Sequence, residues 1–302
     1  MRLTKNTQGA LYMAASMAGF SCSDALSKSV ISVMNAGEIM FLRGLFTSLF
    51  VYLLARHMGA LRSWKVVLQP MIALRILCEA AAAATYITAL GMMPIANASA
   101  IQQAVPLAVT FGAVLFLKEQ VGWRRWTAIA VGFIGVLIII RPGPEGFTAA
   151  ALLGIACMFV TAARDLATRC IDKDVPSLMV TVSTAVSITI FGAALTGPFG
   201  GWQPVGATSL FHIFLASILV LIGYQAVILA MRTGEISFVA PFRYLSLIWS
   251  TLLGLIFFGE MPDSWSVFGA LIVIGSGLYT FYRESKRKTG HVAEESEPRV
   301  PA

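Results

Sequence analysis

The feature that most constrains this chain is an internal duplication with a period of 141 residues. When the sequence is shifted by that distance, chemically similar residues superpose in order along the chain. The pairs are Met17 and Met158, Asp24 and Asp165, Ser27 and Thr168, Lys28 and Arg169, and Glu119 and Glu260. Two copies of one unit must fold alike, so we expect the chain to be built as two structural repeats.

The composition places both repeats in a lipid bilayer. Hydrophobic residues make up 57% of the chain, charged residues 12%, and the mean hydropathy is +0.79. Only helices and closed barrels satisfy their backbone polar groups in lipid, and a helix needs about 20 apolar residues to cross it. The long apolar runs predict ten helical spans, near residues 9–33, 38–56, 66–91, 95–117, 123–140, 147–171, 177–196, 208–231, 236–258 and 264–282.

Five spans in each copy require the second copy to be inverted relative to the first, because an odd number of crossings reverses the direction of the chain. The predicted fold class is therefore an all-α integral membrane protein, with ten transmembrane helices arranged as two inverted five-helix repeats around a central cavity. Pro142 and Pro144 punctuate the boundary, so we assign residues 1–144 and 145–285 to the repeats. The polar residues 286–302 are expected to form a disordered cytoplasmic tail.

The distribution of basic residues predicts that both termini are cytoplasmic. With the N-terminus inside, only Arg141 among the loop cations falls on the outer side. The inner side then holds Arg2, Lys5, Arg56, Arg62, Lys65, Lys118, Arg124, Arg125, Arg169, Lys173, Arg232, Arg283, Lys286, Arg287 and Lys288. The net charge of +7 is thus explained by membrane orientation, and we expect no nucleic-acid partner.

No catalytic, metal or cofactor motif appears in the sequence. The three histidines are scattered, the four cysteines show no CxxC spacing, and no GxxxxGK[ST] loop is present. We therefore expect a protein that is not an enzyme, binds no cofactor or metal, and draws any driving force from a gradient.

Two sets of segments resemble the repeats of the drug/metabolite transporter superfamily, EamA type. In the first copy they are ALGMMPIANA at 89–98 and LKE at 117–119; in the second, AMR at 230–232, AP at 240–241 and FGE at 258–260. The resemblance covers nearly the whole chain, although Lys118 stands where the second copy has Gly259 and Met231 replaces a leucine. It implies a transporter similar to bacterial exporters of amino acids, aromatic ones included, and of lipophilic drug-like cations.

Several ionisable residues fall inside the predicted spans, where each needs a partner or water. Three oppositely charged pairs are spaced four residues apart and are expected to pair along one helix face. These pairs are Asp24 with Lys28, Arg75 with Glu79, and Asp165 with Arg169. The spans that carry them are expected to line the interior, and mutual neutralisation is the alternative to a binding role.

Two spans at matching repeat positions contain a proline in mid-span, Pro106 in the fourth and Pro241 in the ninth. Each follows or precedes a polar pair, Gln102 with Gln103 and Arg243 with Tyr244. Interrupted helices in corresponding halves indicate a substrate site, so we assign both prolines to gating kinks. The competing interpretation is that both prolines only bend helices to fit their neighbours.

Once the three pairs are set aside, Arg43, Arg164 and Arg243 remain as cations without a predicted partner. Arg243 is the first choice to receive a substrate carboxylate, whereas Arg43 is expected to reach the headgroups. The full predicted substrate site is Asp24, Glu79, Tyr86, Ser99, Gln102, Gln103, Arg164, Asp165, Tyr224, Arg243, Tyr244 and Trp249. The aromatic members either stack on an apolar substrate or belong to the core.

These observations predict a secondary exporter of small amphiphilic metabolites in the inner membrane, working as a monomer by alternating access. Amino acids with apolar or aromatic side chains are the expected substrates, with lipophilic cations as a further class. The alternatives are a lipid or nucleotide-sugar carrier of the same superfamily, a membrane-embedded lipid enzyme and an ion channel. A phosphate-bearing ligand would require more clustered basic residues than Arg164 and Arg243 provide.

Overall fold

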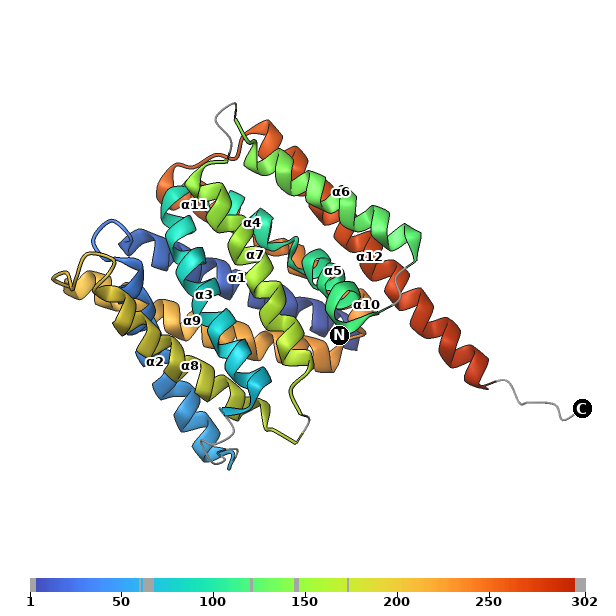
Figure 1. The fold of residues 1–302 in the computed structure, drawn as a ribbon, viewed down its shortest axis with the longest axis horizontal. Coiled ribbons are helices and arrows are strands. Elements are labelled where there is room, and N and C mark those ends of the chain that lie inside the picture. The colour runs from blue at the N-terminus through green and yellow to red at the C-terminus, as the bar shows by residue number, and fades with distance from the viewer. Residues whose placement is uncertain are drawn as a thin grey trace, which may run out of the picture.

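The computed structural model describes residues 4–59, 61, 68–119, 122–143, 147–172 and 174–296, and its regular elements there are helices (Figure 1). The first repeat contains α1 (Lys5–Val30), α2 (Ala36–His57), α3 (Pro70–Met92), α4 (Ile95–Gln102), α5 (Val105–Leu117) and α6 (Trp123–Ile140). The second contains α7 (Ala149–Arg169), α8 (Ser177–Thr196), α9 (Ala207–Thr233), α10 (Ile236–Val239), the 3-10 turn η2 (Ala240–Tyr244), α11 (Leu245–Phe258) and α12 (Ser264–Ser296).

The ten expected spans appear as single helices or, in the fourth and ninth, as consecutive shorter helical pieces, so the predicted fold class is confirmed. Within the described ranges, nine segments are long and apolar enough to cross a membrane. The first helix, α1, is not among them because serine, glycine and charged residues lower its hydropathy, and it packs inside the bundle against α9 and α11. The structure continues α12 as a helix to Ser296, so the first part of the expected tail is helical.

Some sequence-based expectations fall where the structure gives no description. Arg2, Arg62, Lys65 and Lys173, four of the cations used to orient the chain, lie outside the described residues, as do residues 297–302 at the end of the expected tail.

Helix starts follow local sequence signals. In α2, Asn35 and Glu38 form a capping box, because the Glu38 N–H donates to Asn35 Oδ1 at 3.0 Å and the Asn35 N–H donates to Glu38 Oε2 at 2.9 Å. Glu38 is fully buried, and its other carboxylate oxygen accepts the Gln203 N–H. The start of α2 is thereby fixed to the loop between α8 and α9.

Helices of one repeat pack against helices of the other in a pattern that is unchanged when the repeats are exchanged. The pairs are α1 with α9, α3 with α7, α2 with α8, α6 with α12, and the broken span α4–α5 with the broken span that ends in α11. If each helix is replaced by its equivalent in the other repeat, the α1–α9 pair becomes the α3–α7 pair, and each of the other three pairs stays the same. Figure 1 shows α2 with α8 at one edge of the bundle and α6 with α12 at the opposite edge. The repeats are thus related by a pseudo-twofold axis.

Contacts between repeat-equivalent residues locate this axis. The Ser48 and Thr189 hydroxyls, 141 residues apart, are hydrogen-bonded at 3.2 Å. A residue can contact its own repeat mate only where the two-fold axis passes, and Ser48 lies near the middle of α2. The axis therefore passes beside Ser48. Gly37 lies against Thr196 and Gly44 against Thr189, so α2 and α8 run antiparallel, which confirms that the second repeat is inverted.

Small residues allow α2 and α8 to approach closely at this axis. A Cβ atom added to Gly44 would lie 2.6 Å from Thr189 Oγ1, and one added to Gly37 would lie 2.5 Å from the Thr196 nitrogen. Without these glycines the two backbones would be forced apart. This is the way helices commonly associate in lipid, where packing replaces the hydrophobic effect between helices.

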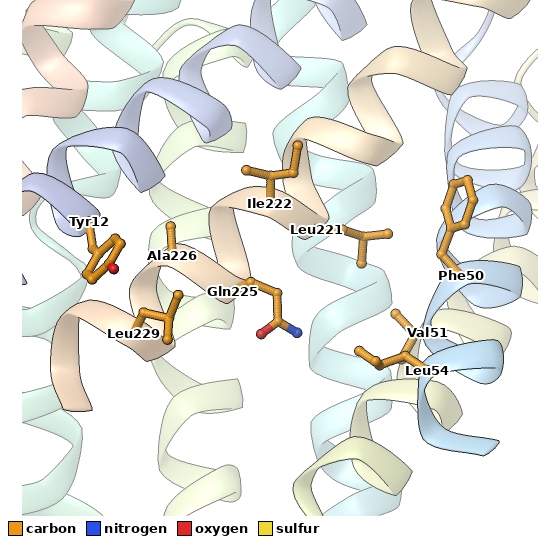
Figure 2. A pocket seen from close by; sticks show the side chains of 9 residues that line it. All are labelled: Tyr12, Phe50, Val51, Leu54, Leu221, Ile222, Gln225, Ala226 and Leu229. Atoms are coloured by element: carbon orange, nitrogen blue, oxygen red, sulfur yellow. The ribbon is translucent and has the colours of Figure 1, made fainter. Parts of the chain in front are cut away.

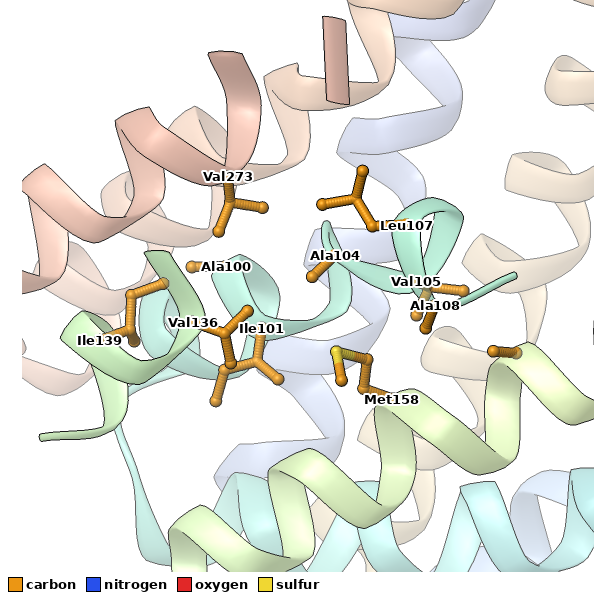
Figure 3. Close-up of a cluster of buried hydrophobic side chains, with 11 residues drawn as sticks. Ala100, Ile101, Ala104, Val105, Leu107, Ala108, Val136, Ile139, Met158 and Val273 are labelled. Atoms are coloured by element: carbon orange, nitrogen blue, oxygen red, sulfur yellow. The ribbon is translucent and has the colours of Figure 1, made fainter. Parts of the chain in front are cut away.

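The two proline-bearing spans are interrupted at matching positions, as predicted. The first is broken between Gln102 and Val105, and the second passes through η2 before α11 begins at Leu245. Figure 3 shows the first break surrounded by apolar side chains, with Ala104 and Leu107 facing residues of α6, α7 and α12. The break is therefore part of a packed core and is held in a defined shape.

Candidate functional site

The centre of the candidate site is a guanidinium that joins two carboxylates. Arg164 on α7 donates from Nε and Nη2 to Asp165 Oδ1 at 2.9 and 2.7 Å, and from Nη1 to Glu79 Oε1 on α3 at 3.1 Å. Three nitrogens of one arginine are used, which requires the planar, forked geometry of a guanidinium. Residues 85 positions apart in sequence are thereby fixed together across the two repeats.

Arg75, one turn before Glu79, extends this charged cluster. Its Nη2 lies 3.8 Å from Glu79 Oε2, its Nε donates to Thr168 Oγ1 at 2.9 Å, and its Nη1 donates to the Thr184 hydroxyl. Arg75 was expected to pair with Glu79, and it does, but it also reaches α7 and α8. Glu79 therefore receives positive charge from both its own helix and the opposite repeat.

A second polar contact connects α1 and α3. The Tyr86 hydroxyl donates to Asp24 Oδ2 at 2.8 Å, and the Arg43 guanidinium of α2 lies close enough to act electrostatically on both groups. Arg43 also donates to Ser27 Oγ at 3.4 Å, so its head stays inside the bundle. The expectation that Arg43 reaches the headgroups is therefore wrong, because Asp24 and Ser27 hold it inward.

Tyr224 on α9 lies beside these polar contacts. It is 50% exposed and its ring meets Phe20 edge-on with a centroid separation of 5.1 Å. Its hydroxyl nevertheless lies within electrostatic reach of Glu79, Arg164 and Arg43, which come from three other helices. Tyr224 therefore places a half-exposed ring beside charged groups of α2, α3 and α7.

Gln102, at the end of α4, has a side-chain oxygen that accepts no hydrogen bond from the described residues. Its Nε2 donates to Cys157 Sγ at 3.2 Å, whereas its Oε1 is buried and has no hydrogen-bond partner among the described residues. Cys157 is 1% exposed and also contacts the Ala82 carbonyl and Thr161. A buried amide oxygen of this kind is costly unless a ligand or water donates to it.

Cys157 is absent from the predicted site. The signal that places it is helical spacing, since positions 157, 161, 164 and 165 share one face of α7. A cysteine reads as a small apolar residue, so the sequence offers no chemical reason to select it.

Two predicted site residues connect the broken spans. Ser99 and Ser250 are hydrogen-bonded at 2.6 Å between their hydroxyl oxygens, and Gln103 Nε2 donates to the Ser246 hydroxyl. Ser21 of α1 reaches the same group through the Ser246 carbonyl at 3.3 Å. In this conformation Ser99 and Gln103 hold the fourth and ninth spans together, and they are separated from the charged cluster.

The remaining predicted residues lie on or near η2. Arg243 is exposed and has no hydrogen bond or ion pair to any residue the structure describes, and it is not among the charges that act on Tyr224. Tyr244 packs its hydroxyl end against Gly277 of α12, and Trp249 is 37% exposed on α11. The structure thus brings Glu79, Arg164 and Asp165 together and joins Asp24 to Tyr86, whereas Arg243 contacts neither group among the described residues.

Pro106 and Pro241 stand at the start of α5 and in η2, at the two breaks. Their role as gating kinks stays a prediction, as do the proposed roles of the other site residues.

Two of the three predicted intrahelical ion pairs are wrong. Lys28 pairs with Glu260 at 2.6 Å instead of Asp24, and Arg169 pairs with Glu119 at 2.9 Å instead of Asp165. Arg164 was expected to lack a partner, yet it holds both Glu79 and Asp165. The spacing rule considers one helix at a time, whereas partners on packed neighbouring helices lie equally near and decide the pairing.

The charged cluster does not follow the repeat symmetry that relates the helices. The repeat mate of Arg164 is Ser23, that of Glu79 is Val220 and that of Tyr224 is Ala83. At the symmetric position Ser23 donates only to the Ala216 carbonyl, at 2.9 Å. Duplication therefore supplies the scaffold and the matching aspartates Asp24 and Asp165, while Glu79, Arg164 and Tyr224 stand at positions where the two copies have diverged.

An apolar groove on the bundle lies away from this cluster. It has a volume of about 400 Å³ and is lined by Tyr12, Phe50, Val51, Leu54, Leu221, Ile222, Gln225, Ala226 and Leu229 (Figure 2). None of these is a predicted site residue, and a groove of this composition suits acyl chains. Within the described ranges, no group of three or more histidine, cysteine or carboxylate side chains has a metal-binding arrangement.

Each half of the sequence matches the same family model. Residues 7–141 and 148–282 each match the model of the EamA-like transporter family. The chain belongs to this family. The two matched segments begin 141 residues apart, which is the period seen in the sequence and at the Ser48 to Thr189 contact. This member of the EamA-like transporter family is thus a multi-pass membrane transporter, and neither the family nor the relatives named below are enzymes.

Related proteins transport different solutes. A riboflavin transporter of Rhizobium johnstonii is 31% identical over 214 residues, which are 71% of this chain and 70% of that protein. An S-adenosylmethionine uptake transporter of Rickettsia bellii is 27% identical over 280 residues, 90% of this chain and 92% of its own length. A pseudopaline exporter of Pseudomonas aeruginosa is 26% identical over 267 residues, 84% and 89% of the two chains.

A solved structure described only as a crystal structure of a protein shares the fold. It has a TM-score of 0.61 and 17% sequence identity, and the match covers 90% of this chain and 95% of that one.

Proposed function

We propose that this EamA-like transporter is a secondary exporter of small amphiphilic metabolites that works by alternating access. The observation that carries the proposal is the polar cluster of Glu79, Arg164 and Asp165 beside the half-exposed Tyr224, inside a bundle of two inverted repeats. A solute bound beside this cluster would contact helices of both repeats. Rocking one repeat against the other would then expose the same site to each side of the membrane in turn.

The chemistry of the cluster favours a solute that combines charge with a ring or another apolar body. Arg164 and Arg75 offer cationic donors, Glu79 and Asp24 offer acceptors, and Tyr224 offers a ring and a hydroxyl. A zwitterion satisfies both signs at once, so amino acids with apolar or aromatic side chains are the leading class. Riboflavin and S-adenosylmethionine, the solutes named for two relatives, also combine rings with polar groups.

We further propose that the protein lies in the inner membrane with both termini in the cytoplasm, as the excess of basic residues at one end of the bundle favours. The end that holds Glu119 and Arg169 is then cytoplasmic. A single chain supplies every residue of the cluster, which supports function as a monomer. The relatives include both an uptake system and an exporter, so flux must be measured in both directions.

Counterflow into proteoliposomes tests the proposal. Vesicles holding purified protein are preloaded with one unlabelled solute and given the same solute labelled outside, for aromatic amino acids, riboflavin, S-adenosylmethionine and a lipophilic cation in turn. Accumulation of a label above that in empty vesicles supports the proposal. Inhibition by sugar nucleotides but not by the other solutes would favour the alternative carrier, and an imposed pH gradient measures proton coupling.

Matched variants tie any flux to the cluster. Tyr224→Phe removes one hydroxyl at the site, and Tyr279→Phe removes one from the exposed Tyr279 of α12. Reduced flux only in Tyr224→Phe supports the assigned site, whereas equal flux in both variants places the solute elsewhere.

A further inference from the structure

Two ion pairs at opposite ends of the bundle are repeat copies of each other. Lys28 Nζ lies 2.6 Å from Glu260 Oε1, and Arg169 Nη2 lies 2.9 Å from Glu119 Oε1. Lys28 and Arg169 are repeat mates, as are Glu119 and Glu260, because each is separated from its mate by 141 positions. Each pair joins a helix of one repeat to the end of the broken span of the other.

Equivalent backbone turns present the two glutamates. Lys118 and Gly259, also repeat mates, end their helices with φ values of 53° and 64°, in the left-handed region. The next residue then bonds back into the helix: the Glu119 N–H donates to the Ala113 carbonyl at 3.2 Å, and the Glu260 N–H to the Gly254 carbonyl at 2.9 Å. Both carboxylates are thereby directed at the opposite repeat.

The two ends nevertheless differ in how tightly they are closed. Lys28 also donates to the Met93 carbonyl at 2.7 Å, and Glu260 Oε2 accepts the Ile95 N–H at 3.0 Å. The Lys28 and Glu260 side chains are 11% and 23% exposed, whereas those of Arg169 and Glu119 are 53% and 40% exposed. The first pair is thus enclosed, and the second is a solvated surface contact.

We propose that these pairs are the two gates of the transport cycle, and that this structure encloses the Lys28 gate while the Glu119 gate is formed but open to solvent. The proposal rests on the alternating access of the proposed function. A pseudo-twofold axis converts the arrangement of one repeat into that of the other, so exchanging the two arrangements gives the opposite-facing state. The solvated Arg169 contact therefore shows what the Lys28 contact becomes when that end opens.

A native cysteine reports on the Lys28 gate. Met93, whose carbonyl holds Lys28, also lies beside Gly154, and Gly154 is one turn from the buried Cys157. The thiol itself is covered by Gln102, Ala82 and Thr161. We expect release of Lys28 to move the Met93 turn away from Gly154 and so to make the neighbouring Cys157 more accessible. The reporter protein carries Cys157 as its sole cysteine, with Cys22, Cys78 and Cys170 replaced by alanine, and is purified in detergent so that both ends meet the reagent.

The measurement is the rate at which a polar maleimide labels Cys157. In the reporter protein the rate should be low, and Lys28→Ala or Glu260→Gln should raise it about tenfold or more, because an enclosed pair has lost one partner. Lys28→Arg, which keeps the charge, should restore a low rate. Arg169→Ala, the repeat-equivalent change at the other end, is the matched control and should leave Cys157 protected.

An unchanged labelling rate in Lys28→Ala and Glu260→Gln would overturn the proposal, and so would an equal rise in Arg169→Ala, which would indicate general loosening. Size-exclusion profiles of all variants establish that they remain folded. Counterflow on the same proteins separates the two proposals. The expected labelling pattern without flux of any solute would support the gates and overturn the proposed function, whereas flux without that pattern would overturn the gates alone.

Discussion

Replacing Arg164 should destabilise the bundle more than any change to a surface arginine. Arg164→Ala leaves Glu79 and Asp165 facing each other without their shared cation, at a depth where charge is costly. Breaking a buried ion pair costs about 3–5 kcal/mol. Asp165 is 40% exposed, so water reduces that penalty and we expect about 2–4 kcal/mol.

Thermal unfolding in detergent measures this loss. For a chain of this size a destabilisation of 2–4 kcal/mol corresponds to a fall of roughly 5–10 °C in the unfolding midpoint. Arg164→Lys should recover only part of it, because one ammonium cannot reproduce bonds made by three guanidinium nitrogens. Adding Asp165→Asn to Arg164→Ala should also recover part, since it removes the carboxylate that has lost its cation, whereas Glu79 keeps Arg75.

Arg141→Ala is the matched control, because Arg141 and Asp263 form an exposed pair of the same chemistry. Its cost should stay below about 1 kcal/mol. The reasoning fails if Arg164→Ala and Arg141→Ala shift the midpoint equally, or if Arg164→Lys is as stable as the unaltered protein.

Three further predictions concern Arg243, the helix ends at Lys118 and Gly259, and the glutamates of the two end pairs. Arg243→Ala should leave counterflow close to that of the unaltered protein, because Arg243 makes no contact with the cluster of Glu79, Arg164 and Asp165 among the described residues; loss of flux in a variant that stays folded in size-exclusion chromatography would return Arg243 to the substrate site. Lys118→Gly should raise stability by about 1 kcal/mol in thermal unfolding, since a side chain is strained at positive φ, and Gly259→Ala should lower it by a similar amount; an opposite sign in either variant contradicts the strain argument. Glu260→Gln should lower the unfolding midpoint more than Glu119→Gln does, because the Lys28–Glu260 pair is enclosed and the Arg169–Glu119 pair is solvated. Equal falls in the midpoint would contradict this difference in burial.

The sequence predicts the helices and their breaks well, because both depend on residues that are close together in the chain. Apolar runs give the spans, and the prolines at 106 and 241 give the breaks at matching positions. The inversion follows from an odd number of crossings, which is independent of any side-chain contact.

The ion pairs could not be predicted in the same way. Asp24 and Lys28 satisfy the spacing rule on α1, yet Tyr86 binds the aspartate and Glu260 binds the lysine. Both partners come from other helices, and Glu260 comes from the other repeat. Choosing between a partner four residues away and one 232 residues away requires knowledge of which helices are neighbours.

Arg243 illustrates the limit of reasoning from charge balance. It was selected because the sequence offers it no counter-ion, and the structure leaves it without one among the described residues. Arg164 was placed in the same class, but the structure gives it two. A cation that has no counter-ion nearby in the sequence can therefore be paired or unpaired in the fold. Arg164 is paired because α7 packs against α3, and the sequence does not show that contact.

The hydrogen bond between Ser48 and Thr189 has a consequence for the origin of the chain. Two separate single-repeat proteins, packed antiparallel in the same way, would place this residue against its own copy in an isologous dimer. One substitution in such an ancestor would alter both sides of the contact at once. In a fused chain the two positions are free to differ, and here a serine faces a threonine at the place where a half-length protein would have met its own copy.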